Sequence, residues 1–560
     1  MNNSLKNSFK WKTLQHNGVA FPPDYSYKGI KIGIKNDQFQ LNKDQEELIY
    51  AWAKKKDSHY IQDNVFQKNF LTDLKKLLPN RFQYIKNISD IDFSEAFGLV
   101  DEEQRIKHRE KEKIKSLPKE EKKKLSAEKK KQKELLKKTY GIAIIDGVEV
   151  EVANWLVEPP GLFMGRGLHP LRGRWKPRIR PQDVILNLDE NSPVPEGAWN
   201  KVVHDHTSTW LATWTETLTS KRKYVWLHDS AILRQDKDRE KYDKAKNLEK
   251  HVEKIEKDII NKMINEKDLN QKKIATVCYL ILKLAMRVGD EKDTDETDTV
   301  GASTLRVEHI KFPETEDGRK FIQFNFLGKD SVPWQKTIQI GSIDTNTLYE
   351  NLRFFMIGKQ KDSEIFDNIN SAKVNSFLRN LDPKNVPGLT AKVFRTYLAT
   401  KIVKDALKSP PVQVGKNSSE FKKIYIAKIA NLSAAIECNH KKGIDPNNPA
   451  SKKAIERLEE SLEKKKQTIM NLRNDIKLKK WKTEKQKEKL ESRIEKITYQ
   501  LKLQKETRDY NLGTSLRNYI DPRAMKWWMD GVGLDWKKVY TTTLQRKFKW
   551  IETSEISKDV

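Results

Sequence analysis

One tyrosine near the C-terminus stands where chemistry is plausible. Tyr519 lies in the stretch GTSLRNYIDPR, after an arginine–asparagine pair and before an Asp-Pro turn. A tyrosine hydroxyl has an ordinary pKa of about 10, so roughly one in a thousand is ionised at neutral pH. A nucleophilic tyrosine therefore needs nearby cations that favour the phenolate. The alternative is a packing residue that docks the tail.

Four basic residues in mostly apolar surroundings are candidates for those cations. Arg287 follows the apolar segment LKLAM, and Arg395 lies in GLTAKVFRTY. A charge there is costly unless it is paired or binds an anion. Lys329 lies in the turn FLGKDS, and His440 ends LSAAIECNH. Taken singly, Arg287 also fits a buried ion pair, and His440 fits a helix cap or a core position.

The composition favours a nucleic-acid partner. The 560 residues include 108 Lys+Arg and 79 Asp+Glu, which gives a net charge of +29. This balance favours nucleic acid ahead of an anionic membrane. The best apolar run, TVCYLILKLAM, is too short to span a bilayer. Two cysteines exclude a disulfide framework and no signal peptide is evident, so we expect a soluble intracellular protein.

Motifs for nucleotide and metal cofactors are lacking. The segment VGKNSS lacks the upstream glycine of a phosphate-binding loop. Cys438 and His440 form a lone pair, whereas a zinc site needs two further ligands at suitable spacing. We therefore expect chemistry that runs on side chains alone, with no required cofactor and no metal.

The elements that must position these residues suggest an α+β protein of two to four domains. Alternation and turn residues predict strands and a helix early in the chain, and strands again over residues 139–230. Residues 101–138 are almost all charged and predict two solvated helices that break near Pro118. Residues 250–440 read as helical, interrupted by the hairpin FIQFNFLGKDSVPWQKTIQI.

Two further segments stand out. Residues 165–180 are dense in Arg and Gly, which suits close approach to phosphates, although an ordinary basic loop is the alternative. In residues 451–508, Leu and Ile recur at steps of 3, 4 or 7, with a polar interruption near residues 479–486. This pattern predicts an antiparallel helical hairpin that protrudes, because its outer faces are charged.

Taken in order, these segments resemble those of eukaryotic-type DNA topoisomerase IB. The sequences TDTVGASTLRVEHI, FLGKDS, GLTAKVFRTY, CNH and NYIDPR are close to that family's catalytic motifs. VEPPGLFMGRGLHP and HDHTSTWLATWTE resemble its upstream DNA-clamp segments. The resemblance runs from about Phe9 to the end of the chain. Two departures are Met164, where many members have Arg, and Lys441, where Gln is common.

The resemblance implies a transesterification on a DNA strand and assigns the catalytic roles. Tyr519 attacks a phosphodiester and forms a 3′-phosphotyrosine, and the broken strand rotates before religation. Arg287, Arg395 and His440 hold the non-bridging oxygens. Lys329 protonates the departing 5′-oxygen. Supercoil strain drives the relaxation, so no ATP is needed.

Further residues are assigned by the same resemblance. DNA contacts fall on Arg166, Lys392, Asp330 and Asn518. The inhibitor camptothecin, which stacks at the nick, is contacted by Phe163, Gly165, Arg166, Asp330 and Asn518.

The resemblance also implies a domain plan and a setting. We expect a two-lobed clamp on double-stranded DNA, with a mostly helical catalytic lobe and a coiled-coil linker, acting as a monomer. A nuclear location is expected. Because the family's long N-terminal region, which directs nuclear import, is missing here, a viral replication compartment or an organelle is the alternative. The expected domains are a short extension (1–8), a cap lobe (9–230), a catalytic core (231–441), the linker (442–508) and a C-terminal domain (509–560).

Two other classes of protein share some of these features. A tyrosine recombinase uses similar chemistry but typically has a histidine three residues before the second arginine, where this chain has Lys392. A non-catalytic DNA clamp or chromatin protein explains the charge and the hairpin. It does not explain five chemically matched residues in order.

Overall fold

The computed structural model describes residues 9–35, 37–165, 167–290, 299–443 and 449–553. The chain divides into two compact units, residues 1–234 and residues 235–560, with only a short segment around residue 295 assigned across that boundary. Each unit holds two clusters of buried apolar side chains. Helices and sheets occur in both units, which confirms the α+β class.

The first unit carries most of the strands, as the turn-rich segments predicted. The strands form two three-stranded sheets, β1-β5-β6 and β3-β2-β4, a four-stranded sheet β10-β9-β11-β12, and the pair β7-β8. Their bounds are β1 (Leu14–His16), β2 (Lys31–Ile34), β3 (Asp37–Gln40), β4 (Ile91–Asp92), β5 (Ile142–Ile145), β6 (Val148–Glu151), β7 (Gly161–Leu162), β8 (Trp175–Lys176), β9 (Ile185–Asn187), β10 (Lys201–Val203), β11 (Trp210–Thr215) and β12 (Arg222–Trp226).

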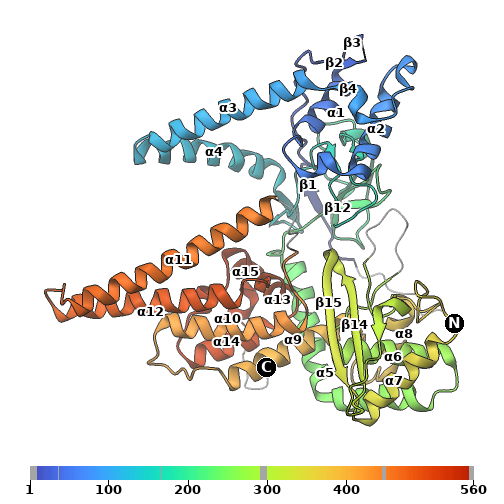
Figure 1. Cartoon of the computed structure of the whole chain (residues 1–560), viewed down its shortest axis with the longest axis vertical. Helices are drawn as coiled ribbons and strands as arrows, with labels where there is room; N and C mark the ends of the chain where they lie inside the picture. Colours follow the sequence, from blue (N-terminus) through green and yellow to red (C-terminus); the bar gives the residue numbers. More distant parts are fainter. Residues whose placement is uncertain (1–8, 36, 166, 291–298, 444–448, 554–560) are drawn as a thin grey trace. The chain divides into compact units, whose positions relative to one another are not determined.

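Four helices complete the first unit: α1 (Lys43–Ala53), α2 (Asn64–Leu77), α3 (Ser94–Ser116) and α4 (Lys119–Tyr140). The apolar faces of α1 and α2 pack in one buried cluster with the start of α3. The rest of α3 and nearly all of α4 are exposed, and the helical conformation is interrupted between them at Pro118 (Figure 1). The prediction of two solvated charged helices is therefore confirmed.

In its described part, the second unit is mostly helical and contains one sheet. The sheet is the antiparallel β13-β14-β15, in which the long hairpin pairs Phe321 with Gln339 and Gly328 with Val332. The element bounds are β13 (Ile310–Lys311), β14 (Phe321–Gly328), β15 (Val332–Gln339), α5 (Ile232–Asn265), α6 (Leu269–Leu284), α7 (Ile343–Met356), α8 (Ser371–Leu381), α9 (Ala391–Lys408), α10 (Glu420–Glu437), α11 (Pro449–Lys477), α12 (Glu484–Glu506), α13 (Leu512–Asn518), α14 (Pro522–Gly531) and α15 (Thr542–Lys547).

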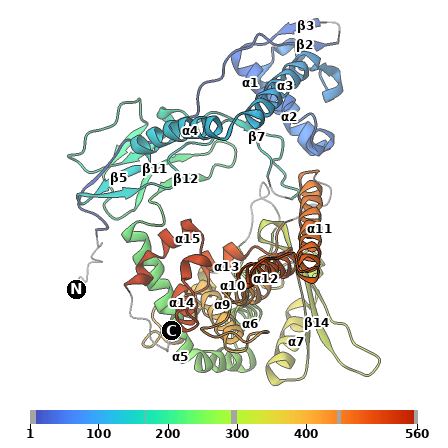
Figure 2. The ribbon, with the colours of Figure 1, turned by 90° about the vertical axis from the view of Figure 1, so that its left-hand side faces the viewer.

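The short helices α13 and α14 pack against α9 and α10, and Figure 2 shows the four helices gathered together. Apolar residues from all four helices share one buried cluster. The chain reverses between α13 and α14 at Asp521, whose carboxylate accepts from the backbone N–H of Arg523 at 2.9 Å. Pro522 occupies the first turn of α14, where its missing N–H costs nothing. The NYIDPR motif thus forms the tight turn that connects α13 to α14.

The predicted helical hairpin is present as α11 and α12, which lie side by side (Figure 1). Its base is closed by backbone hydrogen bonds, from Lys442 N to Asp509 O at 2.8 Å and from Asn511 N to His440 O at 2.8 Å. The hairpin also packs against the rest of the second unit. The C-terminal half of α12 packs on α10, with the rings of Tyr425 and Tyr499 centred 5.2 Å apart.

No helix among the described residues is both long enough and apolar enough to cross a membrane.

Candidate active site

Tyr519 lies directly after the last turn of α13 and is only 7% exposed. Its backbone is held from α9, because Thr400 Oγ1 lies 3.3 Å from the carbonyl oxygen of Tyr519 and accepts from the N–H of Asp521 at 3.0 Å. These bonds fix the corner on both sides of Ile520, which is itself fully buried. The tyrosine is therefore placed by packing and hydrogen bonds, not by a mobile tail.

Arg287 reaches the tyrosine hydroxyl from the end of α6. Its Nη1 donates to Tyr519 Oη at 3.1 Å. The helix α6 is terminated by Ala285, which has a positive φ of 50°. This left-handed backbone conformation costs about 1–2 kcal/mol in any residue other than glycine. It turns the chain out of the helix two residues before the arginine.

Arg395 covers the face of the tyrosine ring. Its guanidinium carbon lies 5.0 Å from the ring centre of Tyr519, and the residue is 4% exposed. Two of its N–H groups donate to backbone carbonyls, those of Ala285 and Cys438. Its Nε is buried and has no hydrogen-bond partner within the described part of the chain. The Nε–H of the guanidinium is thus left without a partner from the described chain inside the site.

His440 stacks beside the same tyrosine. The two ring centres are 5.3 Å apart at an interplanar angle of 24°. Asn439, with a positive φ of 52°, ends the preceding helix, and the N–H of His440 donates back to Ala435 O at 2.8 Å. Nδ1 of the histidine lies 2.7 Å from Ser515 Oγ. Nε2 is buried and, among the described residues, lacks a partner.

The pKa values of Tyr519 and His440 are both shifted by their surroundings. Burial opposes ionisation of Tyr519, but the charges of Arg395 and Arg287 and the hydrogen bond from Arg287 lower its pKa below the ordinary value. Burial, assisted by the same two arginines, lowers the pKa of His440 to about 3. The histidine is therefore neutral near pH 7 and carries a single N–H. The tyrosine is biased toward the phenolate.

A small pocket of about 110 Å³ joins these groups to the hairpin turn. Lys329 and Asp330 form that turn between β14 and β15, and Asp330 takes a positive φ of 66°. Both side chains line the pocket, as do those of Arg287, Arg395, His440 and Lys441. The structure therefore brings the five predicted catalytic residues together. Arg287, Arg395 and His440 contact Tyr519, and Lys329 lines the same pocket as these three residues.

The remaining predicted residues of this unit lie close by. Asn518 precedes the tyrosine at the end of α13, and its Nδ2 donates to Thr514 O at 3.1 Å. Lys392 lies in the first turn of α9, on the exposed side of the helix. Arg395, three residues further along, points into the core. Lys392 is thus outside the tyrosine cluster, as suits a residue that contacts a ligand at the rim.

The other predicted residues belong to the first unit. Phe163 packs edge-on against His169, with ring centres 4.7 Å apart. Gly165 has a φ of 65°, and a Cβ there would lie 2.4 Å from the Cβ of His169. A glycine is therefore required for local reasons. Arg166 lies outside the described residues.

Three arginines of the basic segment 165–180 pair with carboxylates of the same unit, which favours the alternative of an ordinary basic loop at these positions. Arg172 Nε donates to Asp63 at 2.9 Å, and Arg174 forms a bidentate ion pair with Asp73, with N···O distances of 2.7 and 2.9 Å. Arg178 Nη2 donates to Glu47 at 2.9 Å. The carboxylates come from α1, α2 and the residue before α2, so these arginines hold the segment onto the helices.

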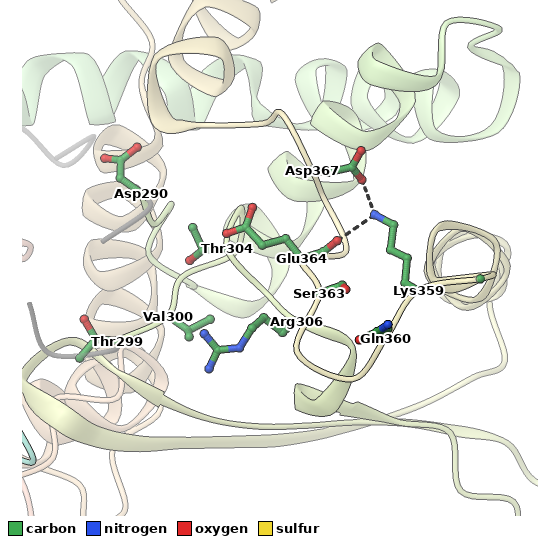
Figure 3. Close-up of a pocket in the computed structure, with 11 residues that line it drawn as sticks. Asp290, Thr299, Val300, Thr304, Arg306, Lys359, Gln360, Ser363, Glu364 and Asp367 are labelled. Carbon is green, nitrogen blue, oxygen red and sulfur yellow. Dashed lines mark hydrogen bonds and ion pairs between the residues drawn. The ribbon is translucent and has the colours of Figure 1, made fainter. Parts of the chain in front are cut away.

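A second, larger pocket of about 780 Å³ lies elsewhere in the second unit (Figure 3). Lys359 projects along its wall, but its ammonium donates to Glu364 O at 2.8 Å and pairs with Asp367. Asp290 accepts from the N–H of Ser371 at 2.9 Å. The charges of Lys359 and Asp290 there already have protein partners. This pocket is therefore a weaker candidate than the tyrosine site.

The tyrosine site can stabilise an anion beside a nucleophile. Nε of Arg395 is an N–H donor, and Nε2 of His440 is one in the tautomer that carries the ring proton there; such donors suit oxygens that gain negative charge. Among the described residues, no group of three or more His, Cys, Asp or Glu side chains could hold a metal ion. The chemistry for which this arrangement is suited is attack by Tyr519 on an anionic phosphoryl centre.

Comparison with known families agrees with the geometry. Residues 9–227 match the family model described as the DNA-binding fragment of eukaryotic DNA topoisomerase I, residues 230–476 match its catalytic core, and residues 491–558 match the C-terminal topoisomerase domain. The chain belongs to the eukaryotic DNA topoisomerase I family. The family predicted from the sequence motifs is thus confirmed.

Relatives of the family share about a third of the residues. DNA topoisomerase 1 beta of Arabidopsis thaliana is 35% identical over 97% of this chain and 58% of its own length. DNA topoisomerase 1 of Homo sapiens is 35% identical over 97% of this chain and 70% of its own. The chain therefore spans little more than half the length of the plant family member.

Two residues that position the site were not found from the sequence. Ser515 lies in the quoted motif, four residues before Tyr519 and hence on the same face of α13, but nothing marked it as the partner of His440. Thr400 lies five residues after Arg395 and looked like an ordinary helix residue. Only the fold shows that both hydroxyl groups are aimed at the catalytic corner.

Proposed function

We propose that this protein is a type IB DNA topoisomerase that relaxes supercoiled duplex DNA by transient cleavage of one strand. The observation that carries the proposal is the contact of Arg287 Nη1 with Tyr519 Oη, with Arg395 and His440 packed on the same ring. The family membership supplies the context, and the cluster supplies the reacting groups.

In the proposed reaction Tyr519 Oη attacks a backbone phosphorus, and the phenolic proton passes to water. The bond from phosphorus to the 5′-oxygen breaks as the bond to the tyrosine forms, with the two oxygens in line. The products are a 3′-phosphotyrosine and a free 5′-hydroxyl. After the strand has rotated, the 5′-hydroxyl attacks the same phosphorus and restores the tyrosine.

Each cation has a separate task in this scheme. Arg287 stabilises the phenolate and then a non-bridging oxygen of the phosphoryl group. Arg395 uses its unpartnered Nε for a non-bridging oxygen, since two of its other N–H groups are held by backbone carbonyls. His440 donates from Nε2 to an oxygen of the same group. Permanent charge and planar geometry make arginine suited to this work.

Lys329 is the proposed general acid. An alkoxide leaves poorly, so a proton must reach the 5′-oxygen as the bond breaks. The lysine lies in a hairpin turn and lines the same pocket as Arg287, Arg395 and His440. Its flexible stem lets the ammonium reach a leaving oxygen without moving the strands.

No cofactor is needed in this scheme. One phosphoester replaces another, so no nucleotide has to be hydrolysed, and the arginines supply the positive charge that a metal ion would otherwise provide. Supercoil strain sets the direction.

The wider assignments follow from the family. The two units form the lobes of a clamp on double-stranded DNA, α11 and α12 form a coiled-coil linker that tunes rotation, and the protein acts as a monomer in the nucleus. Counterion release from a chain of charge +29 supplies much of the affinity. Phosphate contacts position the duplex and leave the sequence preference weak. Further DNA contacts are assigned to Arg166, Lys392, Asp330 and Asn518.

The deciding experiment is relaxation of a supercoiled plasmid in EDTA without nucleotide, followed by a denaturing gel for covalent complexes. Wild-type protein is expected to relax the plasmid and to form a 3′-linked complex. Tyr519→Phe removes only the nucleophilic oxygen, so both activities should vanish while duplex binding stays within about twofold of the wild type.

A matched control is Tyr540→Phe. The Tyr540 hydroxyl is buried and has no partner among the described residues, so its removal should leave relaxation unchanged. Duplex binding without a covalent complex would place the protein among non-catalytic clamps. Strand exchange between two duplexes in place of relaxation would place it among recombinases.

A further inference from the structure

We propose that Ser515 is a positioning residue that fixes the tautomer of His440, so that the single N–H of the imidazole faces the reacting phosphate. The inference rests on the proposed function for its effect on rate. The hydrogen bond and the tautomer are properties of the protein without DNA and can be tested separately.

The geometry joins the serine to both reacting rings. Ser515 is fully buried on α13, and its Oγ lies 2.7 Å from Nδ1 of His440. Its carbonyl oxygen accepts from the N–H of Tyr519 at 2.9 Å and from that of Ile520 at 3.1 Å. A single residue thus orients the imidazole with its side chain and the nucleophile with its backbone.

The tautomer follows from proton counting. A neutral imidazole has one N–H, and the other nitrogen is an acceptor. The hydroxyl of Ser515 has no second hydrogen bond among the described residues, so its proton is available to Nδ1. When the hydroxyl donates to Nδ1, the ring proton must be on Nε2. That nitrogen is buried without a protein partner in the described chain, which leaves it for the substrate.

The opposite tautomer would be harmful to catalysis. With the proton on Nδ1, Nε2 would present a lone pair to a phosphoryl oxygen, and two acceptors repel. Burial and the charges of Arg395 and Arg287 keep the ring neutral, so a doubly protonated imidazolium does not remove the problem. The serine therefore decides which nitrogen can donate.

The test uses three variants of the full chain on a duplex substrate that traps the cleaved state. Ser515→Ala is expected to slow single-turnover cleavage about 10- to 100-fold, as for partners that orient metal-binding histidines, with duplex affinity unchanged. Ser515→Thr keeps the hydroxyl and should recover most of the rate. Ser433→Ala is the matched control, because that hydroxyl bonds only within its own helix, to Ile429 O at 3.3 Å, and cleavage should be unchanged.

Two further readouts separate positioning from a general packing role. In a His440→Gln background, Ser515→Ala should slow cleavage less than twofold, because the hydroxyl acts through the imidazole. In DNA-free protein, long-range proton–nitrogen spectra should show the Nε2–H form in the wild type and a mixture of forms in Ser515→Ala.

The outcomes are distinct. An equal slowing by Ser515→Ala in both backgrounds, or a wild-type spectrum of the Nδ1–H form, overturns the inference. Failure of the wild-type protein to cleave any duplex overturns the proposed function, and the spectra still decide the tautomer.

Discussion

Substitution of the two active-site arginines by lysine should separate catalysis from stability. Arg287→Lys and Arg395→Lys make the same chemical change on the same tyrosine. Arg287 is half-buried, and its one side-chain hydrogen bond among the described residues is to Tyr519 Oη. Arg395 is buried and bonds two backbone carbonyls as well as covering the ring.

The magnitudes follow from these partners. Loss of a planar donor aimed at the transition-state charge costs about 10²–10³ in rate, so both variants should cleave at least 100-fold more slowly than the wild type. An ammonium in place of Arg395 can reach one of the two carbonyls. The other loses a charged hydrogen bond worth about 1.5–3 kcal/mol. At about 2–4 °C per kcal/mol, Arg395→Lys should lower Tm by about 3–12 °C.

Arg287→Lys, by contrast, leaves no buried carbonyl unpaired, and we expect its Tm to stay within about 2 °C of the wild type. The assays are single-turnover cleavage of an end-labelled duplex and thermal unfolding of the same preparations. If both variants lose the same Tm, the carbonyl contacts of Arg395 do not stabilise the fold as argued. If Arg287→Lys cleaves within tenfold of the wild type, the contact with the tyrosine is not the one that catalysis uses.

Three further predictions follow from the same geometry. Replacement of residues 443–508 by a short Gly/Ser loop should leave cleavage measurable, because the base of the hairpin is closed by its own hydrogen bonds; complete loss of cleavage by a folded variant would refute this. Camptothecin should accumulate the covalent complex, and Asn518→Ser or Asp330→Gly should weaken this accumulation more than relaxation; an unchanged cleaved fraction over a wide dose range would overturn the assignment. Because the pKa of His440 is lowered to about 3, the unfolded chain binds the proton more readily, and lowering the pH from 6.5 to 5 should cost about 2 kcal/mol of stability. Wild type should therefore lose stability relative to His440→Gln as the pH falls, measured as a fall in the wild-type urea midpoint minus that of the variant across this range.

The secondary structure was largely predictable because its signals are local. Alternating residues gave the hairpin of β14 and β15, and charge without an apolar stripe gave the exposed helices on either side of Pro118. The helical hairpin was also found, but its attachment to α10 was not. That contact depends on Tyr425 and Glu506, whose hydroxyl and carboxylate meet at 3.0 Å across 81 positions of sequence.

The basic segment of the first unit shows why composition alone misled. Arg172, Arg174 and Arg178 looked ready for phosphates because their acidic partners lie more than 100 residues away in sequence. An arginine fork binds a carboxylate with the same geometry as a phosphate, so the residue type cannot distinguish the two. The catalytic arginines escaped this ambiguity because order and surrounding motifs, not charge, identified them.

The ends of three helices explain how the site keeps positive charge in a buried place. The C-termini of α6 and α10 bring their last carbonyls to Arg395, and α13 ends at Tyr519 itself. A helix C-terminus carries partial negative charge, which stabilises a cation there by about 0.3–2 kcal/mol. The guanidinium is thus held by carbonyl dipoles and not by a carboxylate. A carboxylate partner would have cancelled its charge, whereas dipoles leave the net charge available to the phenolate and to an incoming phosphate. The same reasoning predicts that an acidic residue that pairs with the Arg395 guanidinium would raise the pKa of Tyr519, which a spectroscopic titration of the tyrosine would detect as a shift of its ionisation to higher pH.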